Sequence, residues 1–283
     1  MTGSLVEQRY GKSRVRVLKI LRDGDTHRIK ELDVAVMLSG DFASSYTSGD
    51  NSAVVPTDTI KNTVHALAKE HLGAENERFA LTLARHFLAK YPQVRRVEVE
   101  ARERLWDRLA IDGTPHPHSF TAARSVRPFA RVEAMADSQR IESGIEDLLI
   151  LKSTQSGFAD FPRCEFTTLR ETDDRIFATA LSATWIWSPE TEPADFAQAN
   201  SAILEAMLGP FALNYSPSVQ TTLFQMGEAA LAACAEIARI HLAMPNKHCL
   251  LLDLAPFGLE NRNEVFIPTD EPHGQIEATI ARA

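Results

Sequence analysis

The sequence lacks the short glycine motifs that mark several large classes of enzymes. No two of its 13 glycines are separated by a single residue, so the dinucleotide-binding pattern G-x-G-x-x-G does not occur. The phosphate-binding pattern G-x-x-x-x-G-K-S/T and the serine-hydrolase pattern G-x-S-x-G are also missing. Nicotinamide, nucleoside triphosphate and serine-hydrolase chemistries therefore have no motif to support them.

Cysteine is scarce as well. The three cysteines, Cys164, Cys234 and Cys249, are odd in number, far apart and outside any C-x-x-C pair. Isolated cysteines of this kind behave as small apolar residues in a reducing compartment. We therefore expect no disulfide framework.

Long apolar and long basic runs are both absent. No segment approaches the ~18 apolar residues of a membrane span, residues 1–14 have no apolar signal core, and the C-terminal TIARA is no sorting tripeptide. The net charge of −8 and the lack of a Lys/Arg run argue against a phosphate-backbone partner. We expect a soluble cytoplasmic protein with no nucleic-acid and no membrane partner.

The composition that is present is that of a folded globular protein. With 283 residues, 44% hydrophobic and 24% charged, the chain suits one large domain or two of about 140 residues. Residues 14–20 and 28–38 alternate like the strands of a hairpin, and apolar stripes predict helices after residue 57 and over 75–91. Extended segments over 94–106, 118–126 and 128–136 follow. The first half thus has the order β, β, α, α, β, β.

The second half repeats this order with a different sequence. Strands are predicted over 147–155 and 174–187, helices over 195–211 and 216–242, and closing strands over 247–257, 264–270 and 274–282. We therefore expect an α+β protein of two tandem ββααββ repeats, 1–135 and 136–283, with antiparallel sheets that carry helices on one face. Because such sheets leave edge strands unpaired, an oligomer that closes them into a barrel is a reasonable hypothesis.

Two clusters could carry chemistry but have simpler interpretations. His116 and His118 would project to one face of a strand, yet no third ligand lies nearby in the sequence and GTPHPH is rich in turn residues. We favour a structural loop over a metal site. Asp173 and Asp174 stand beside Arg175, where solvated charges at a strand end are more common than an acid/base pair.

The stretch PTDTIKN contains more candidate helix caps than one helix needs. Thr57, Asp58 or Thr59 could each cap the helix that follows Pro56, and no Glu or Gln three positions later completes a capping box. From these residues alone, a capping role is favoured over a chemical one.

A second helix start has the features of an anion site. In SPSVQ, Ser216 is a good N-cap and Pro217 suits the first helical position, which leaves the N–H groups of Val219 and Gln220 in the first turn. Such a turn favours an anionic ligand. Arg175 could add a bidentate donor, although a lone arginine at a strand end is more often in a surface ion pair.

Taken together, these pieces resemble the urate oxidase (uricase) family over almost the whole chain. The resemblance rests on eight segments: YGKSRVRV (10–17), GDNSAVVPTDTIKNTV (49–64), DGTPHPHSF (112–120), LKSTQSGF (151–158), TTLRETDDRI (167–176), SVQTT (218–222), MPNKH (244–248) and NEVFIPTDEPHGQIEATI (263–280). It implies the tunnelling fold, in which each chain supplies two ββααββ repeats and a homotetramer closes the sheets into a barrel.

The resemblance also implies a urate-binding set. Phe158 would stack on the purine plane, while Arg175 and Gln220 would hold urate through bidentate hydrogen bonds. The N–H of Val219 would add a donor. Asn246 would lie above the ring, where dioxygen and then water or peroxide bind.

The remaining implied residues form a proton relay. Lys12 and Thr57, with His248 alongside, would move the proton of urate, and Asp58 would bind urate through its backbone. Thr59 is left as the plain helix cap. Lys12, Thr57 and Asp58 would come from one subunit and the other site residues from its neighbour.

The implied reaction is oxidation of urate by dioxygen to 5-hydroxyisourate and hydrogen peroxide, with neither cofactor nor metal. Two alternatives remain open at this point: another tunnelling-fold enzyme that acts on a pterin or purine, and a non-catalytic urate-binding protein.

Overall fold

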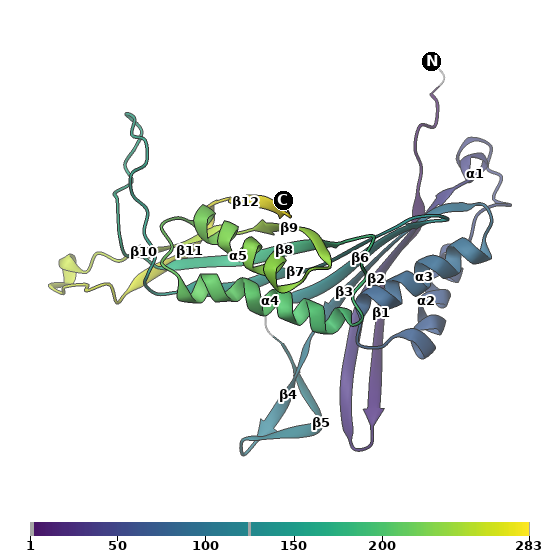
Figure 1. Ribbon diagram of the computed structural model, residues 1–283, viewed down its shortest axis with the longest axis horizontal. Helices are drawn as coiled ribbons and strands as arrows, with labels where there is room; N and C mark the ends of the chain where they lie inside the picture. Colours follow the sequence, from purple (N-terminus) through teal and green to yellow (C-terminus); the bar gives the residue numbers. More distant parts are fainter. Residues whose placement is uncertain (1–2, 124–125, 283) are drawn as a thin grey trace. The chain divides into compact units, whose positions relative to one another are not determined.

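The computed structural model describes residues 3–123 and 126–282 and divides the chain into two compact units. Unit 1 comprises Met1–Gly144 and Ile186–Gln198, and unit 2 comprises Ile145–Trp185 and Ala199–Ala283. Figure 1 colours the elements along the sequence. Each unit combines antiparallel strands with helices, which confirms the predicted α+β class.

Unit 1 is built on an antiparallel sheet with the order β1-β2-β3-β6-β7. Its elements are β1 (Tyr10–Asp23), β2 (Thr26–Gly40), α1 (Ala43–Thr47), α2 (Thr57–His71), α3 (Asn76–Lys90), β3 (Val94–Arg104), β4 (Trp106–Ile111), β5 (Thr114–Ala122), β6 (Arg127–Met135) and the first part of β7 (Gln139–Lys152). The predicted first hairpin is confirmed, because β1 and β2 pair around residues 24 and 25.

The helices of unit 1 bury the predicted apolar stripes. Ile60 and Val64 of α2 and Phe79, Leu83 and Phe87 of α3 are fully buried. α2 packs on β1, and α3 packs on β3 and β6 (Figure 1). The two helices therefore cover one face of the sheet and turn their apolar stripes toward it.

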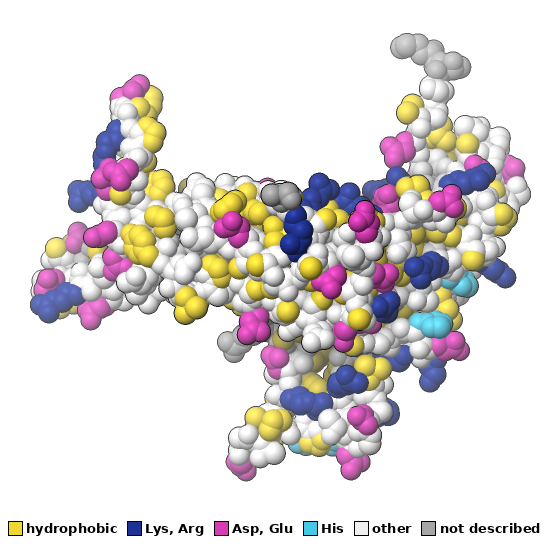
Figure 2. All heavy atoms as spheres, in the orientation of Figure 1, with side chains coloured by type: hydrophobic (Ala, Val, Ile, Leu, Met, Phe, Trp, Pro, Cys, Tyr) yellow, Lys and Arg dark blue, Asp and Glu magenta, His cyan; other side chains and the backbone are white. Residues whose placement is uncertain are grey.

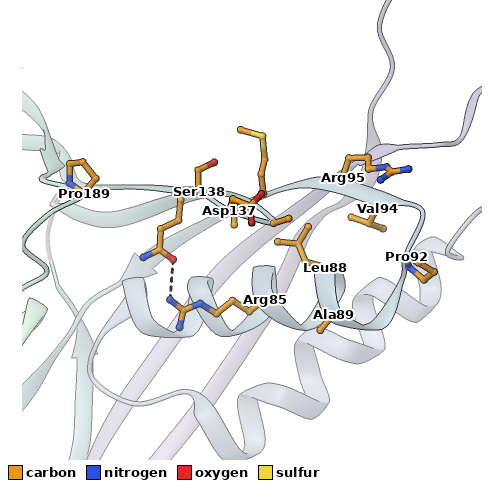
Figure 3. Close-up of a pocket in the computed structure, with 13 residues that line it drawn as sticks. Arg85, Leu88, Ala89, Pro92, Val94, Arg95, Asp137, Ser138 and Pro189 are labelled. Atoms are coloured by element: carbon orange, nitrogen blue, oxygen red, sulfur yellow. Dashed lines mark hydrogen bonds between the residues drawn. The ribbon is translucent and has the colours of Figure 1, made fainter.

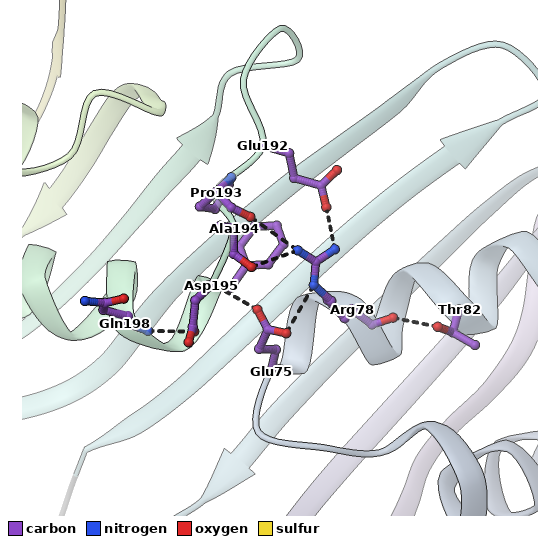
Figure 4. A network of polar contacts seen from close by, with 9 residues as sticks. Glu75, Arg78, Thr82, Glu192, Pro193, Ala194, Asp195 and Gln198 are labelled. Atoms are coloured by element: carbon purple, nitrogen blue, oxygen red, sulfur yellow. Dashed lines mark hydrogen bonds and ion pairs between the residues drawn. The ribbon is translucent and has the colours of Figure 1, made fainter.

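Hydrogen bonds and ion pairs connect the start of α3 to the segment 189–196 of the same unit (Figure 4). Arg78 bonds Glu75 and Glu192, each at 3.1 Å, and its guanidinium lies 5.3 Å from the ring centroid of Phe196. Glu75 in turn accepts the backbone N–H of Phe196 at 2.7 Å. This network anchors the chain just before α4 begins.

Unit 2 contains the rest of β7, most of β8 (Phe177–Trp187), most of α4 (Phe196–Leu213), α5 (Val219–Ala233), β9 (Ile237–Ala243), β10 (Asn246–Leu251), the 3-10 helix η1 (Ala255–Phe257), β11 (Phe266–Gly274) and β12 (Glu277–Ala281). Its strands follow the order β7-β8-β10-β11, while β9 pairs with both β8 and β12. α5 packs on β9 and β12.

The predicted helix over 216–242 was wrong in its last third. α5 ends at Ala233, and β9 follows at Ile237. Ile237, Ile240 and Leu242 are completely buried in β9. No Gly or Pro lies between the helix and the strand, so the sequence gives no local signal that the helix ends. The strand conformation of β9 depends on its pairing with neighbouring strands.

The structural loop expected at GTPHPH is also corrected. β5 begins at Thr114 and forms a separate two-stranded hairpin with β4, with Asp112 and Gly113 in its turn. Both turn residues have positive φ, 51° and 77°, as a tight hairpin turn requires. Residues 124 and 125 of the extended segment predicted over 118–126 lie outside the described residues.

Within the described ranges, no helix is both long enough and apolar enough to cross a membrane. Figure 2 shows acidic and basic side chains interspersed over the visible face, with hydrophobic side chains between them.

Candidate active site

Lys12 lies near the start of β1, beside a local irregularity of the strand. It pairs with Val36 of β2, and the register shifts between Lys12 and Val15. Arg14 within this bulge has φ 57°. A Cβ atom on Gly11 would overlap the carbonyl oxygen of Val36, so the backbone on both sides of Lys12 is tightly constrained.

Thr57 is the first residue of α2, and its side chain is exposed. The N-cap position is occupied by Pro56, which makes no side-chain cap hydrogen bond. The prediction of Thr59 as the cap was therefore wrong: it is the third helical residue, and its carbonyl accepts the Thr63 hydroxyl at 2.8 Å. The first backbone N–H groups of α2 have no partner within the helix.

Asp58 directs its carboxylate along its own helix. It accepts hydrogen bonds from Lys61 at 2.5 Å and from Asn62 at 2.9 Å. The hydrogen bond from Lys61 lowers the pKa of Asp58, and the charge of Lys12 lowers it further. Lys12 and the start of α2 are therefore electrostatic neighbours within unit 1.

In unit 2, the segment 155–158 lies between two other segments of the chain and forms backbone hydrogen bonds with both. On one side, Gly157 donates its N–H to the carbonyl of Ser216 at 2.8 Å, and Ser216 donates to Gln155 at 2.9 Å. A Cβ atom on Gly157 would overlap the hydroxyl of Tyr215 and press on the carbonyl of Thr172. Only glycine fits where the two segments cross. The sequence did not single out Gly157 as a residue of the site.

On its other side, the same segment meets residues 172–175. Phe158 and Thr172 exchange two backbone hydrogen bonds of 2.7 and 3.1 Å, and the N–H of Arg175 bonds the carbonyl of Ser156 at 2.8 Å. These contacts bring Phe158, Arg175 and the start of α5 together from three separate parts of the sequence.

Arg175 and Phe158 form the centre of this cluster. The guanidinium carbon lies 5.5 Å from the Phe158 ring centroid, and Phe161 stacks on Phe158 with centroids 5.0 Å apart. The Nε of Arg175 is buried and has no hydrogen-bond partner among the described residues. Burial also lowers the pKa of Arg175. A buried donor without a partner is costly, so this guanidinium is suited to an acceptor that the ligand brings.

The start of α5 differs from the prediction by two residues. The N-cap is Ser218, whose hydroxyl accepts the N–H of Thr221 at 3.1 Å. Ser216 is instead buried and accepts the Thr222 hydroxyl at 2.6 Å, so the N-cap assignment of Ser216 was wrong. Val219 is nonetheless in the first turn, as predicted, and its backbone N–H has no partner within the helix.

Gln220 and Asn246 occupy two further element ends of unit 2. Gln220 is the second residue of α5 and is exposed. Asn246 begins β10, where it faces Thr179 of β8 and Gly274 of β11. His248 follows on β10 beyond a register shift and is exposed.

The acidic and histidine pairs singled out in the sequence have structural partners. Asp174 accepts the Thr154 hydroxyl at 2.7 Å, and the carbonyl of Asp173 accepts the Tyr215 hydroxyl at 3.0 Å. The rings of His116 and His118 lie side by side, with centroids 4.5 Å apart. Among the described residues, no three His, Cys, Asp or Glu side chains form a group that could hold a metal ion.

A groove of about 850 Å³ lies elsewhere on unit 1, between α3 and the β6–β7 turn (Figure 3). It includes Arg85, which donates to Gln139 at 3.0 Å, and the exposed Met135. None of the predicted site residues lines it.

The fold and the Arg175–Phe158 cluster define a class of protein: an α+β protein in which an aromatic side chain, a buried guanidinium Nε without a partner among the described residues and the first turn of a helix lie together. The Uricase family model matches residues 8–133 and 141–277. The uricase of Dictyostelium discoideum is 39% identical over 283 residues, which cover 99% of this chain and 98% of that protein.

The uricase of Arthrobacter globiformis is 42% identical over 278 residues, which cover 98% of this chain and 90% of that protein. Its crystal structure superposes with a TM-score of 0.93 at 41% identity, covering 100% of this chain and 96% of that one. The chain belongs to the uricase family. It is an enzyme, an oxidoreductase that acts on urate.

Proposed function

We propose that this enzyme oxidises urate with dioxygen and water to 5-hydroxyisourate and hydrogen peroxide. Atoms balance in this reaction, because urate gains one oxygen atom from water while dioxygen takes up two electrons and two protons as peroxide. The observation that carries the proposal is the Nε of Arg175, a buried donor without a partner, beside the face of Phe158. Together they suit a planar anion such as urate.

Urate binding uses the cluster of unit 2. The purine stacks on Phe158, Arg175 and Gln220 hold one edge through bidentate hydrogen bonds, and the N–H of Val219 adds a donor. Their positions at a helix start and beside a buried guanidinium support these roles. Asn246, half-buried at the start of β10, contacts dioxygen and the water that replaces it.

Proton transfer uses Lys12 and Thr57 of unit 1, with His248 of unit 2 alongside. A threonine hydroxyl is too weak an acid or base to act alone, so it passes the urate proton on to the amine of Lys12. Asp58 contributes its backbone N–H to urate, which agrees with a carboxylate already engaged by Lys61 and Asn62.

The resulting urate dianion is electron-rich enough to reduce dioxygen itself. For this reason we propose that the reaction needs no flavin, haem or metal.

The two residue sets act across a subunit interface in a homotetramer of the tunnelling fold. Each chain contributes two ββααββ repeats, 1–135 and 136–283, and the sheets of several chains close into a barrel. Support comes from the exposure of Thr57 and Asp58 and from the exposed hydrophobic side chains of the β10–β11 region, Leu250, Phe257 and Ile267. The edge strands β1 and β11 have free backbone groups for pairing.

The test follows the near-UV absorbance of urate together with oxygen uptake and peroxide release, using chelator-treated protein. We expect one peroxide and one oxygen per urate consumed. Tight urate binding without oxygen uptake would favour a non-catalytic binder, and loss of turnover on chelation would contradict the cofactor-free mechanism.

A further inference from the structure

Tyr10 connects the two segments of unit 1 that carry the proposed proton relay. It is the first residue of β1, two positions before Lys12, and its hydroxyl oxygen accepts the backbone N–H of Val55 at 2.7 Å. Val55 is 2% exposed and lies two positions before Thr57. One hydrogen bond therefore joins the start of β1 to the start of α2 across 45 residues of sequence.

The Tyr10 ring packs against a buried aromatic residue. It meets the buried Phe42 edge to face, with centroids 4.8 Å apart and planes at 88°. Burial raises the pKa of the Tyr10 hydroxyl, although the hydrogen bond from Val55 opposes this, and the neighbouring Tyr46 and Tyr91 raise it further. The hydroxyl therefore keeps its proton at neutral pH and acts as a neutral hydrogen-bonding group.

The segment that precedes α2 is held in place by few side-chain hydrogen bonds. Residues 48–56 form no regular element, and Pro56 has no N–H to donate. Gln93 holds this segment at the carbonyl of Ala53, and Tyr10 holds it at Val55. Of these two side chains, Tyr10 acts closer to Thr57.

Lys12 lies on the same face of β1 as Tyr10. Side chains two apart on a strand project to the same face, so Lys12 leaves β1 on the side of the Tyr10 ring. The charge of Lys12 also acts on Asp58, the residue after Thr57. These are independent indications that the start of β1 and the start of α2 form one local arrangement.

We propose that Tyr10 is a positioning residue for urate oxidation: its hydroxyl sets the separation between the Lys12 amine and the Thr57 hydroxyl. This inference rests on the relay of the proposed function. Tyr10 touches neither urate nor dioxygen in this role, and it acts only through the two segments that it joins.

The test uses Tyr10→Phe in the full-length protein, which keeps the ring on Phe42 and removes only the acceptor of the Val55 N–H. We expect kcat to fall about tenfold or more, with KM for urate and the Kd of xanthine, a purine that lacks the 8-oxo group, within about twofold of wild type. The pH profile of kcat should shift, since the relay geometry changes. Tyr46→Phe, on α1 nearby, is the matched control and should keep wild-type kinetics.

A double-mutant cycle separates positioning from general destabilisation. In a Thr57→Ala background the relay is already broken, so Tyr10→Phe should cost nothing further in kcat. Three results would overturn the role: kcat of Tyr10→Phe within about twofold of wild type, an equal loss in the Thr57→Ala background, or a loss accompanied by equal weakening of xanthine binding and an unshifted pH profile.

The same experiment distinguishes this inference from the relay itself. If Thr57→Ala and Lys12→Ala turn over urate at the wild-type rate, the relay fails and the Tyr10 role fails with it. If those two variants are inactive and Tyr10→Phe is fully active, only the Tyr10 role is wrong.

Discussion

The guanidinium of Arg175 lies over the ring of Phe158, with its carbon 5.5 Å from the ring centroid. They are 17 positions apart in the sequence, and backbone hydrogen bonds from Phe158 to Thr172 and from Arg175 to Ser156 hold both in place. A cation and an aromatic face are therefore preorganised side by side, which lowers the entropy lost when a flat anion binds.

Arg175→Lys should weaken urate binding, because an ammonium group cannot reproduce the planar pair of donors. We expect KM for urate and Kd for xanthine to rise about 10- to 100-fold, the range for a lost charge-assisted hydrogen bond. Steady-state kinetics and calorimetric titration measure the two. Arg163→Lys, at an exposed arginine paired with Glu171, is the control. Unchanged xanthine binding in Arg175→Lys would contradict the assignment.

Lys12→Ala and Thr57→Ala should each reduce kcat by about two orders of magnitude or more while xanthine still binds, because they remove proton transfer and leave the stacking site intact. Stopped-flow urate absorbance gives the rate. Thr63→Ala, which removes a hydroxyl bonded within α2, should leave kcat near wild type. The relay is excluded if either relay variant reaches the wild-type rate.

Mixed oligomers test whether sites are shared between subunits. Thr57→Ala and Arg175→Ala are each expected to be severely impaired, but subunits of both kinds in one oligomer would form some sites with neither lesion. Co-expression with two affinity tags, followed by an activity assay of the doubly purified oligomer, should recover about a quarter of the wild-type rate if the subunits mix at random. No recovery in verified mixed oligomers would place all site residues within one subunit.

Gly157→Ala should disrupt the site and destabilise the fold, because its methyl group would overlap the Tyr215 hydroxyl where 155–158 crosses 214–216. We expect a loss of about 1–3 kcal/mol together with a raised KM. Thermal unfolding at fixed protein concentration gives the first quantity. Gly73→Ala, between α2 and α3, is the control: beyond its chain neighbours the added Cβ would meet no atom within 4 Å, so stability should stay within about 0.5 kcal/mol of wild type. Equal stability of both variants would refute the close crossing.

Arg78→Ala should loosen the segment before α4, since it removes the contacts to Glu75 and Glu192 and the packing on Phe196. Arg78 is partly exposed, so the expected loss is only about 1–2 kcal/mol. Because the network contains none of the proposed urate-binding residues, KM for urate should stay near wild type. Glu192→Gln, which removes one charge and keeps the side chain, should lose less than Arg78→Ala. A smaller loss for Arg78→Ala would contradict this ranking.

Local patterns predicted much of the fold. The alternation of β1 and β2 and the apolar stripes of α2 and α3 identify these elements because their periods match the faces they bury. β9 was missed because a buried strand and the end of a buried helix have similar apolar content. The cap at Ser218 was missed because Ser216 is an equally good local candidate, and only its bond with Thr222 decides between them.

For the candidate site, the sequence by itself determined which residue types are present and that their motifs follow the order of the uricase family. It also determined that Val219 and Gln220 fall in a first helical turn. Tertiary structure alone decided that Ser156 meets Ser216, that Arg175 lies on Phe158 and that Tyr10 binds Val55. The physical reason is that hydrophobic periodicity specifies which face of an element is buried, whereas contacts between distant segments depend on how whole elements pack.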